Sequence, residues 1–438
     1  MNELWLRELM DRAVADEPPM GPVPVNSLRA GIKQRRRRRA QGAVACLGAA
    51  ALIGTAAVAA TGTAGNLAAG PAKMTGPSTV YVLSGEGNLY AIANATRVRG
   101  KRIQLPGGRQ FMAITPNGKT IYVSGDEPNA VIPVSTVTDT AGKPIQFGRQ
   151  VPTQILITPN GKTAYVTGLS GGEIYPIATA TNTMEKPINA GQGFGGLYQM
   201  ALTPDGKTLY VVSSKPGGTG PSYVIPISTA TNTPGKPIKI QSADVGEIVV
   251  NPDGTAVYAI GGSPTGTDII PISTATNTPG KPSNLGEAAG ALAITPGGQN
   301  LYLVRNGVTS GPSGVIPFSA ATNTAGKLIK VNGMVSAIAV TPDGNTAYAA
   351  SEPRQNPAVV NCTGRTGEVT PISTVTNLPG RPIRVACDPY ALAVTPDGKT
   401  VWVGSRNWVT PISTATNTAG QPIKFRGAFV AMVVALSP

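Results

Sequence analysis

The sequence predicts an all-β protein, a β-propeller of eight four-stranded blades, with seven blades as the alternative if one unit is degenerate. Three observations predict this fold: a unit that repeats along residues 79–438, a strand-and-turn pattern within each unit, and two ends that complete one another. An apolar segment before the repeats predicts one transmembrane helix.

A landmark of Thr-Pro, or a close equivalent, recurs along the chain. Its positions, 42 to 54 residues apart, are Thr115, Thr158, Thr203, Asn251, Thr295, Thr341, Thr395 and Ser437. This spacing is the length of a four-stranded propeller blade.

One unit, residues 200–240, shows the expected order of strands. "MALTP" is apolar and predicts a buried inner strand, and "PDGK" supplies the residues of a turn. "TLYVVSS" and "YVIPIST" predict the next two strands. "ATNTPGK" predicts a second turn, and "KPIKI" an outermost strand, where proline is tolerated because it has no N–H to donate.

The two ends of the repeat region complement each other. Residues 79–105 contain the last three strands of a unit without its first, whereas "FVAMVVALSP" at 429–438 resembles a first strand alone. Pairing the C-terminal strand with the N-terminal strands makes one more blade. The ring then closes with no open sheet edge.

Four regions follow from composition. We expect a cytoplasmic basic tail with a short amphipathic helix at 1–39, a transmembrane signal-anchor at 40–62, a flexible linker at 63–78 and the propeller at 79–438. The block Arg35–Arg39 should stay in the cytoplasm, which makes a single-pass membrane protein with an extracytoplasmic propeller. A cleaved signal and a secreted ring are the alternative.

Histidine is absent and there are three cysteines, so the composition excludes His-dependent triads and His-ligated metals. We expect no metal, no cofactor and no catalytic residue. Cys362 lies in a long loop and Cys387 in the following crossover, on the same side of the ring. An exported chain would allow them to form a disulfide.

The recurring pattern "TPDGKT-x-YV" followed by "VIPISTATNT-x-GKPI" resembles the YVTN family of β-propeller repeat proteins, and "AYVTG" at 164–168 is nearly its motif. The resemblance covers residues 79–438. This chain departs from the family in placing "IPIS", with its proline, in the third strand. The resemblance implies a mostly extracytoplasmic propeller with poorly defined ligands, and it brings no catalytic residues.

In an antiparallel meander the first turn of a unit, after its first strand, and the second turn, after its third strand, share one face, which we call the turn face. The loop between the second and third strands and the crossover to the next unit share the other face, which we call the loop face. Variable loops on a constant scaffold are where binding sites are usually built. The ligand-binding candidates of the loop face are Arg109, Phe111, Arg149, Gln154, Tyr198, Gln199, Glu247, Glu287, Tyr390 and Arg426.

The turn face collects cations that could meet an anionic polymer or lipid headgroups, or could simply suit exposed turns. They are Lys101, Lys119, Lys143, Lys162, Lys186, Lys207, Lys236, Lys281, Lys327, Arg381 and Lys399. The net charge of the chain is +14.

These observations favour a monomeric, membrane-anchored scaffold that binds a protein, a peptide, a surface glycan or a cell-wall polymer, and we expect no enzymatic activity. One alternative is a lactonase-like hydrolase with a carboxylate site in the central funnel, for which Asp244, Glu247, Glu287 and Asp388 are the candidates. Another is a binder of single-stranded nucleic acid, which an external location argues against.

Overall fold

The computed structural model describes residues 78–436 except 127–128, 170–171, 192–195, 215–219, 264, 287–288, 307–311 and 353–365. All described residues belong to one compact unit, which lies within residues 53–438. The predicted tail, anchor and linker therefore lie outside the described residues, apart from Ser78. Within the described ranges, no helix has the length and apolar character needed to cross a membrane.

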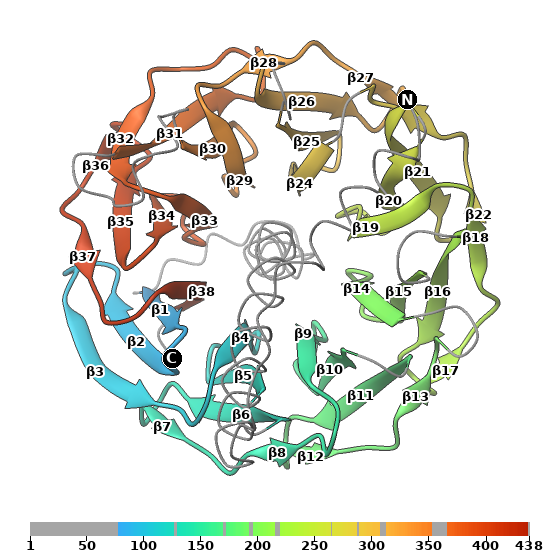
Figure 1. Ribbon diagram of the computed structural model, residues 1–438, viewed down its shortest axis with the longest axis horizontal. Coiled ribbons are helices and arrows are strands. Elements are labelled where there is room, and N and C mark those ends of the chain that lie inside the picture. Colours follow the sequence, from blue (N-terminus) through green and yellow to red (C-terminus); the bar gives the residue numbers. More distant parts are fainter. Residues whose placement is uncertain are drawn as a thin grey trace, which may run out of the picture. The chain divides into compact units, whose positions relative to one another are not determined.

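The described residues fold into antiparallel sheets that follow one another around a central axis (Figure 1). Each sheet is one blade, whose strands a, b, c and d run from the axis outward. There are eight such blades. The predicted eight-bladed, four-stranded propeller is thus confirmed, and the seven-bladed alternative is excluded.

Blades 1 to 4 are built as follows, with strand a first. Blade 1 has β38 (Phe429–Leu436), β1 (Ser78–Ser84), β2 (Asn88–Ala93) and β3 (Arg99–Gln104). Blade 2 has β4 (Arg109–Ile114), β5 (Thr120–Asp126), β6 (Asn129–Ser135), β7 (Thr140–Ala141) and β8 (Ile145–Gln146). Blade 3 has β9 (Pro152–Ile157), β10 (Thr163–Gly168), β11 (Glu173–Ala178), β12 (Thr183–Met184) and β13 (Ile188–Asn189). Blade 4 has β14 (Gly196–Leu202), β15 (Thr208–Ser214), β16 (Ser222–Ser228), β17 (Thr233–Pro234) and β18 (Ile238–Ile240).

Blades 5 to 8 follow the same plan. Blade 5 has β19 (Ala243–Val250), β20 (Ala256–Ser263), β21 (Gly266–Ser273), β22 (Thr278–Pro279) and β23 (Ser283–Asn284). Blade 6 has β24 (Ala289–Ile294), β25 (Asn300–Arg305), β26 (Gly314–Ser319), β27 (Thr324–Ala325) and β28 (Ile329–Lys330). Blade 7 has β29 (Met334–Val340), β30 (Thr346–Glu352), β31 (Thr366–Ser373) and β32 (Ile383–Ala386). Blade 8 has β33 (Pro389–Val394), β34 (Thr400–Ser405), β35 (Trp408–Ser413), β36 (Thr418–Ala419) and β37 (Ile423–Lys424).

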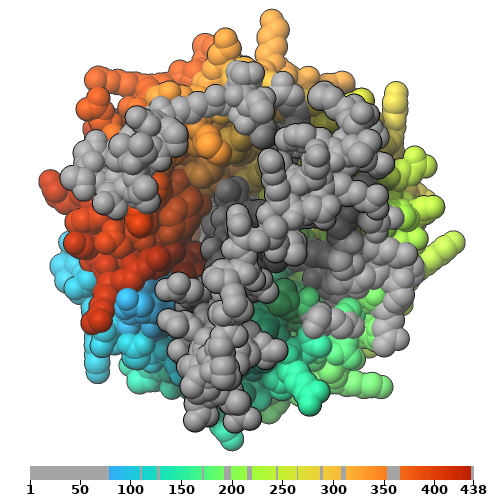
Figure 2. Space-filling view, in the orientation of Figure 1, coloured from blue at the N-terminus to red at the C-terminus, as the bar shows by residue number. Residues whose placement is uncertain are grey.

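The ring closes through its two ends, as the sequence predicts. β38 pairs with β1 from Ser78↔Leu436 to Ser84↔Phe429. The first and last parts of the ring therefore lie side by side, and their blue and red colours adjoin in Figures 1 and 2. This pairing supplies blade 1 with its inner strand.

Strand d differs from the prediction of one continuous outer strand. In blade 4 it is two short pieces, β17 and β18, which pair with opposite ends of β16. The interruption faces Pro226 of β16, which has no N–H to donate, and only the Pro226 carbonyl accepts a bond there, from the Gly235 N–H at 2.7 Å. The proline of "IPIS" therefore divides the outer strand.

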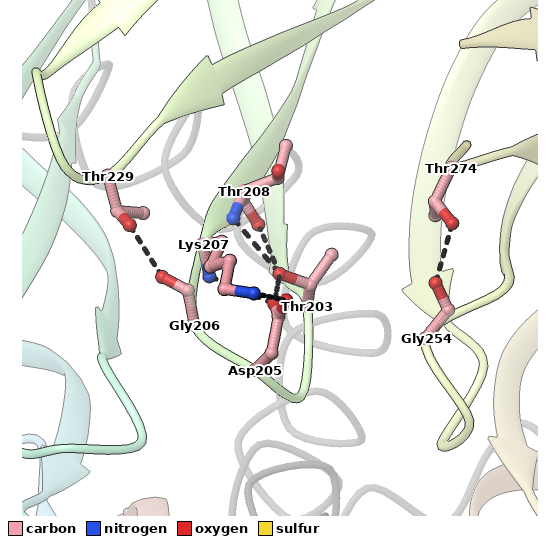
Figure 3. Close-up of polar contacts among 8 residues, drawn as sticks. All are labelled: Thr203, Asp205, Gly206, Lys207, Thr208, Thr229, Gly254 and Thr274. Atoms are coloured by element: carbon pink, nitrogen blue, oxygen red, sulfur yellow. Dashed lines mark hydrogen bonds and ion pairs between the residues drawn. The ribbon is translucent and has the colours of Figure 1, made fainter. Parts of the chain in front are cut away.

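In six blades the first turn is held by the landmark threonine, as Figure 3 shows for blade 4. In blade 4, Thr203 Oγ1 donates to Asp205 Oδ1 at 2.7 Å and accepts from the Thr208 N–H at 3.0 Å. Thr229, in the second turn, donates from Oγ1 to the Gly206 carbonyl at 2.6 Å. The two turns therefore lie together, which confirms the turn face.

A second repeated contact joins neighbouring blades, and we call it the interblade latch. The hydroxyl of Tyr210 in β15 donates to Asn277 Oδ1, in the second turn of blade 5, at 2.7 Å. Asn277 has φ 54°, a left-handed conformation that asparagine tolerates. Equivalent bonds of 2.6 to 2.8 Å are Tyr122–Asn182, Tyr165–Asn232, Tyr302–Asn377 and Tyr348–Asn417. Between blades 8 and 1 Trp402 Nε1 donates to Asn94 Oδ1 at 2.9 Å, although the left-handed residue of that turn is Arg97.

The core lies between blades as well as within them. One apolar cluster joins Tyr210 and Val224 of blade 4 to Val257 and Ile270 of blade 5, and all four are buried. Because each blade packs both faces against its neighbours, the sheets form one continuous core around the axis. This leaves the inner edges of the eight a strands to line the axis.

Candidate functional site

Three consecutive blades carry a polar side chain at one position of their inner strand. Gln154 in β9, Gln199 in β14 and Glu247 in β19 each precede the landmark of their blade by four residues. We call these three residues the inner polar arc. The five other blades have Phe111, Ala291, Ala337, Ala391 or Val433 there.

All three side chains of the arc are buried. Their exposed fractions are 5% for Gln154, 6% for Gln199 and 8% for Glu247. Burying a polar side chain costs free energy unless its hydrogen bonds are made. The partners of these groups therefore decide whether the arc only supports the fold or is prepared for a ligand.

Gln154 is fully engaged with the next blade. Its Oε1 accepts from the Met200 N–H at 2.6 Å, and its Nε2 donates to the Met200 carbonyl at 3.3 Å. The inner edge of strand a has no neighbouring strand, so its backbone groups need other partners. Gln154 supplies them for β14 and links blades 3 and 4.

Glu247 of blade 5 makes the corresponding contact with the backbone of blade 6, but through a carboxyl group. Its carboxyl group accepts a hydrogen bond from the Leu292 backbone, which lowers its pKa. Burial has the larger effect and raises the pKa of Glu247 to about 8. The group is therefore mostly protonated at neutral pH, and its O–H can donate.

Gln199 lies in blade 4, between the blades of Gln154 and Glu247. Among the described residues its Oε1 has no hydrogen-bond partner. A buried amide oxygen without a partner is uncommon in folded proteins. It marks a point where an O–H or N–H from a ligand would be stabilising.

The arc lies beside irregular pairing of the inner strands. The register shifts between Leu197 and Met200 in β14 and between Ala243 and Glu247 in β19. Such bulges redirect side chains and are frequent next to functional sites. Blades 2, 6, 7 and 8 shift at the same point, so the bulges belong to the shared plan of the blade and do not single out the arc.

Other predicted site residues are used by the fold. The Tyr390 hydroxyl donates to the Phe429 carbonyl at 2.7 Å, and the two rings meet edge to face at 5.3 Å. Arg426 Nε lies 3.3 Å from Glu86 Oε2 in an exposed ion pair. Arg149 is exposed and Phe111 is half-buried. These four residues are not part of the arc.

Several predicted residues fall outside what the structure describes. Arg109 and Tyr198 lie in β4 and β14, but their side chains are outside the described set, as is the side chain of Asp244 and the whole of Glu287. Cys362 is also outside it, while Cys387 is buried. The predicted disulfide therefore stays a prediction.

Sequence reasoning missed one polar bridge of the same kind. Asn306, after β25, donates from Nδ2 to the Val335 carbonyl at 2.7 Å and accepts at Oδ1 from the Val335 N–H at 2.9 Å. It also missed that Gln154, Gln199 and Glu247 share one position. Counting back from each landmark would have shown the shared position.

The described residues do not form a metal-binding site. No group of three or more Cys, Asp or Glu residues capable of holding a metal ion occurs within them. Asp388, another carboxylate considered for the funnel, lies 3.8 Å from Arg406 in an ion pair. Among the described side chains of the inner strands, Glu247 is the buried carboxyl group.

No family model matches the chain, and no curated protein matches its sequence. The resemblance to the YVTN family therefore stays a prediction. Solved structures do match the fold. Hydrazine synthase from Kuenenia stuttgartiensis has 17% identity and a TM-score of 0.53, over 76% of this chain and 99% of that one.

A second match is the dihydro-heme d1 dehydrogenase NirN, solved in complex with DHE. It has 11% identity and a TM-score of 0.66, over 81% of this chain and 74% of that one. At these identities the likeness shows the propeller fold alone. Both proteins are enzymes by name, which contradicts our expectation that this chain has no enzymatic activity. A propeller without a recognisable catalytic motif gives no ground for that exclusion, because enzymes share its fold.

Proposed function

We propose that the propeller is a binding module whose ligand contacts the inner polar arc. The unpartnered oxygen of buried Gln199, between Gln154 and protonated Glu247, is the observation that carries this proposal. At neutral pH the arc offers amide and carboxylic acid groups with little net charge. It therefore suits a ligand with hydroxyl or amide groups, and a surface glycan is the class we favour.

The wider arrangement of the chain agrees with such a ligand. We propose that residues 40–62 anchor the chain in a membrane and that the propeller lies on the extracytoplasmic side as a monomeric ring. Uncharged residues at 40–62 after the Arg35–Arg39 block support the anchor. A ring on the extracytoplasmic side would be exposed to surface glycans and not to cytoplasmic ligands.

Equilibrium binding of neutral polysaccharide fragments tests this function. Wild-type protein should bind, and Gln199→Ala should lower the affinity about tenfold, because one buried hydrogen bond to the ligand is lost. Gln421→Ala is the matched control, since Gln421 is an exposed amide of blade 8. Equal affinities of wild type and Gln199→Ala would place the ligand elsewhere.

Glu247 favours a second candidate function, a hydrolase that uses one carboxyl group as a general acid. A carboxylic acid that stays protonated near neutral pH can donate its proton to a leaving group and then accept one from water. Turnover of a lactone or glycoside that is abolished by Glu247→Gln, with unchanged stability at pH 5, would support it. Turnover that survives this substitution would exclude Glu247 as the acid.

The nucleic-acid alternative gains no support from the loop face. Phe147 and Phe425, two aromatic residues of the crossovers, are 6% and 4% exposed. Phe147 packs edge to face on Tyr175, and Phe425 packs against Tyr90. Buried rings cannot stack on bases.

A further inference from the structure

Large apolar side chains are exposed at the second turns of three blades. Val98 of blade 1 is 62% exposed, Val137 of blade 2 is 61% exposed, and Val375 and Leu378 of blade 7 are 81% and 66% exposed. In most other blades the sequence "ATNT" has alanine or threonine at these positions. Single exposed apolar residues are ordinary, but these four lie at the tips of equivalent turns.

These blades are neighbours around the closure of the ring. Blade 8 lies between blades 7 and 1, and blade 2 follows blade 1, so the apolar tips occupy an arc of blades 7, 8, 1 and 2 (Figure 1). The four tips belong to the turn face, because the second turn of each blade lies beside its first. In blade 2, for example, Thr136 Oγ1 donates to the Gly118 carbonyl at 2.6 Å.

Cations accompany the apolar tips on the same arc. Exposed basic residues there are Lys101, Lys119, Lys143, Arg381 and Lys399. The carboxylates of the same turns are Asp139, Asp343 and Asp397. Positive charge is therefore in excess around the apolar tips, as on surfaces that bind anionic lipid.

The chain also enters the ring at this face. Ser78, the first described residue, begins β1, and its carbonyl accepts from the Asn94 N–H in the second turn of blade 1 at 2.8 Å. The preceding residues include Arg35–Arg39 and the uncharged residues 40–62. The segment with the composition of a membrane anchor is thus joined to the ring on the basic, apolar arc.

We propose that the turn face of blades 7, 8, 1 and 2 docks on an anionic lipid surface. Val98, Val137, Val375 and Leu378 enter the headgroup region, and the surrounding lysines and arginines contact lipid phosphates. The loop face then points away from the membrane. This arrangement is independent of which ligand the inner polar arc binds.

The test uses the full chain reconstituted into phosphatidylcholine vesicles that contain brominated phosphatidylglycerol. A tryptophan is introduced by Val137→Trp on the turn face or by Leu169→Trp, whose position is 67% exposed on the loop face. The native tryptophans are common to both variants. The bromine atoms should quench the added fluorescence of Val137→Trp and leave that of Leu169→Trp unchanged.

A charge substitution tests the lipid contribution. Lys143→Glu added to Val137→Trp should weaken docking by about fivefold or more, since each cation near an anionic surface contributes about that factor. Lys239→Glu, in β18, makes the same charge change beyond the proposed arc and should leave the quenching unchanged. Equal effects of the two substitutions would overturn the proposal, because they would indicate a non-specific charge effect.

Other outcomes also overturn the proposal. Equal quenching of both tryptophans would show no preferred face, and no quenching of either would show that the turn face meets a protein or solvent instead. Anchoring is read separately, from whether the chain stays with the vesicles after an alkaline carbonate wash. A chain that is washed off refutes the anchor, whereas quenching before the wash still tests the docking face.

Discussion

The repeated asparagine of "ATNT" serves two purposes at once. It adopts the left-handed conformation that the second turn requires, and its side chain accepts the hydroxyl of a tyrosine from the preceding blade, as Asn277 does from Tyr210. Burial raises the pKa of Tyr122, Tyr165 and Tyr348 to about 12, so these hydroxyls remain donors at physiological pH. One residue type therefore shapes the turn and joins the blades.

Tyr210→Phe should destabilise the ring by about 1 to 2 kcal/mol, because Asn277 Oδ1 would lose its partner in a mostly buried place. Tyr258→Phe is the matched control. Asn323 holds the place one blade further on that Asn277 holds for Tyr210, but among the described residues its Oδ1 has no partner. Asn323 instead donates from Nδ2 to the Lys281 carbonyl at 3.0 Å. Urea midpoints that fall equally for both variants would show that the latch contributes no stability.

Glu247 should make the stability of the ring depend on pH. Its pKa is about 8 in the folded protein, against 4.5 for an ordinary glutamate, so the folded state retains a proton that the unfolded state releases. Stability is then greatest below about pH 4.5 and falls as the pH rises toward 8, by roughly 1.4 kcal/mol per pH unit.

Glu247→Gln should remove this slope between pH 5 and 8, because the amide does not titrate. Glu185→Gln, at an exposed position of blade 3, should leave it unchanged. Denaturant unfolding at several pH values measures both variants. Parallel profiles for wild type and Glu247→Gln would mean that Glu247 is ionised at neutral pH, and the general-acid function would lose its basis.

At the scale of the element, glycine is required for two separable reasons, which a first turn and a crossover between blades illustrate. Gly206 has φ 71°, and a Cβ there would lie 2.9 Å from Cδ of Pro159 in the preceding blade. Gly148 has φ 60°, but a Cβ there would meet nothing within 4 Å. A side chain at Gly206 would bring backbone strain and a clash between blades, whereas a side chain at Gly148 would bring the strain alone.

Gly148→Ala should therefore cost about 1 kcal/mol and Gly206→Ala clearly more. Thermal unfolding of the two variants isolates the contact with Pro159. A larger loss for Gly148→Ala would contradict the close approach of neighbouring first turns.

The predicted bond between Cys362 and Cys387 also belongs to this scale, because it would tie a loop of blade 7 to the crossover into blade 8. In the entropic model a closed loop of this size contributes about 3 kcal/mol. Peptide mass spectrometry without reductant should recover the two cysteines in one linked pair, and reduction should lower the melting temperature. Free thiols at both positions would refute the bond.

At the scale of the whole molecule, most of the architecture is predictable because it is repeated. The spacing of the landmark implies the number of blades, and the complementary ends imply the closure by β38 and β1. The divided strand d was not predicted. Pro226 is visible in the sequence, but its effect appears only when Gly235 of the outer strand lies opposite it.

The candidate site was predictable only in part. Gln154, Gln199 and Glu247 were all selected from the crossovers, but grouped with residues such as Tyr390 and Arg426 that the fold uses elsewhere. The distinction depends on which side chain finds a backbone partner in the next blade. That information lies in the packing of neighbouring sheets and not in one repeat.

Hydrogen exchange of the closing strands tests the central claim most directly, because every blade and the inner polar arc depend on a closed ring. Amides of Val80–Leu83 in β1 should exchange as slowly as those of β10 and β15, which also have a strand on each side. The β38 amides that bond to β1 should exchange as slowly as the corresponding amides of the inner strands β9 and β14. Rapid exchange of these β38 amides, with protection retained in β9 and β14, would show an open ring and contradict the account.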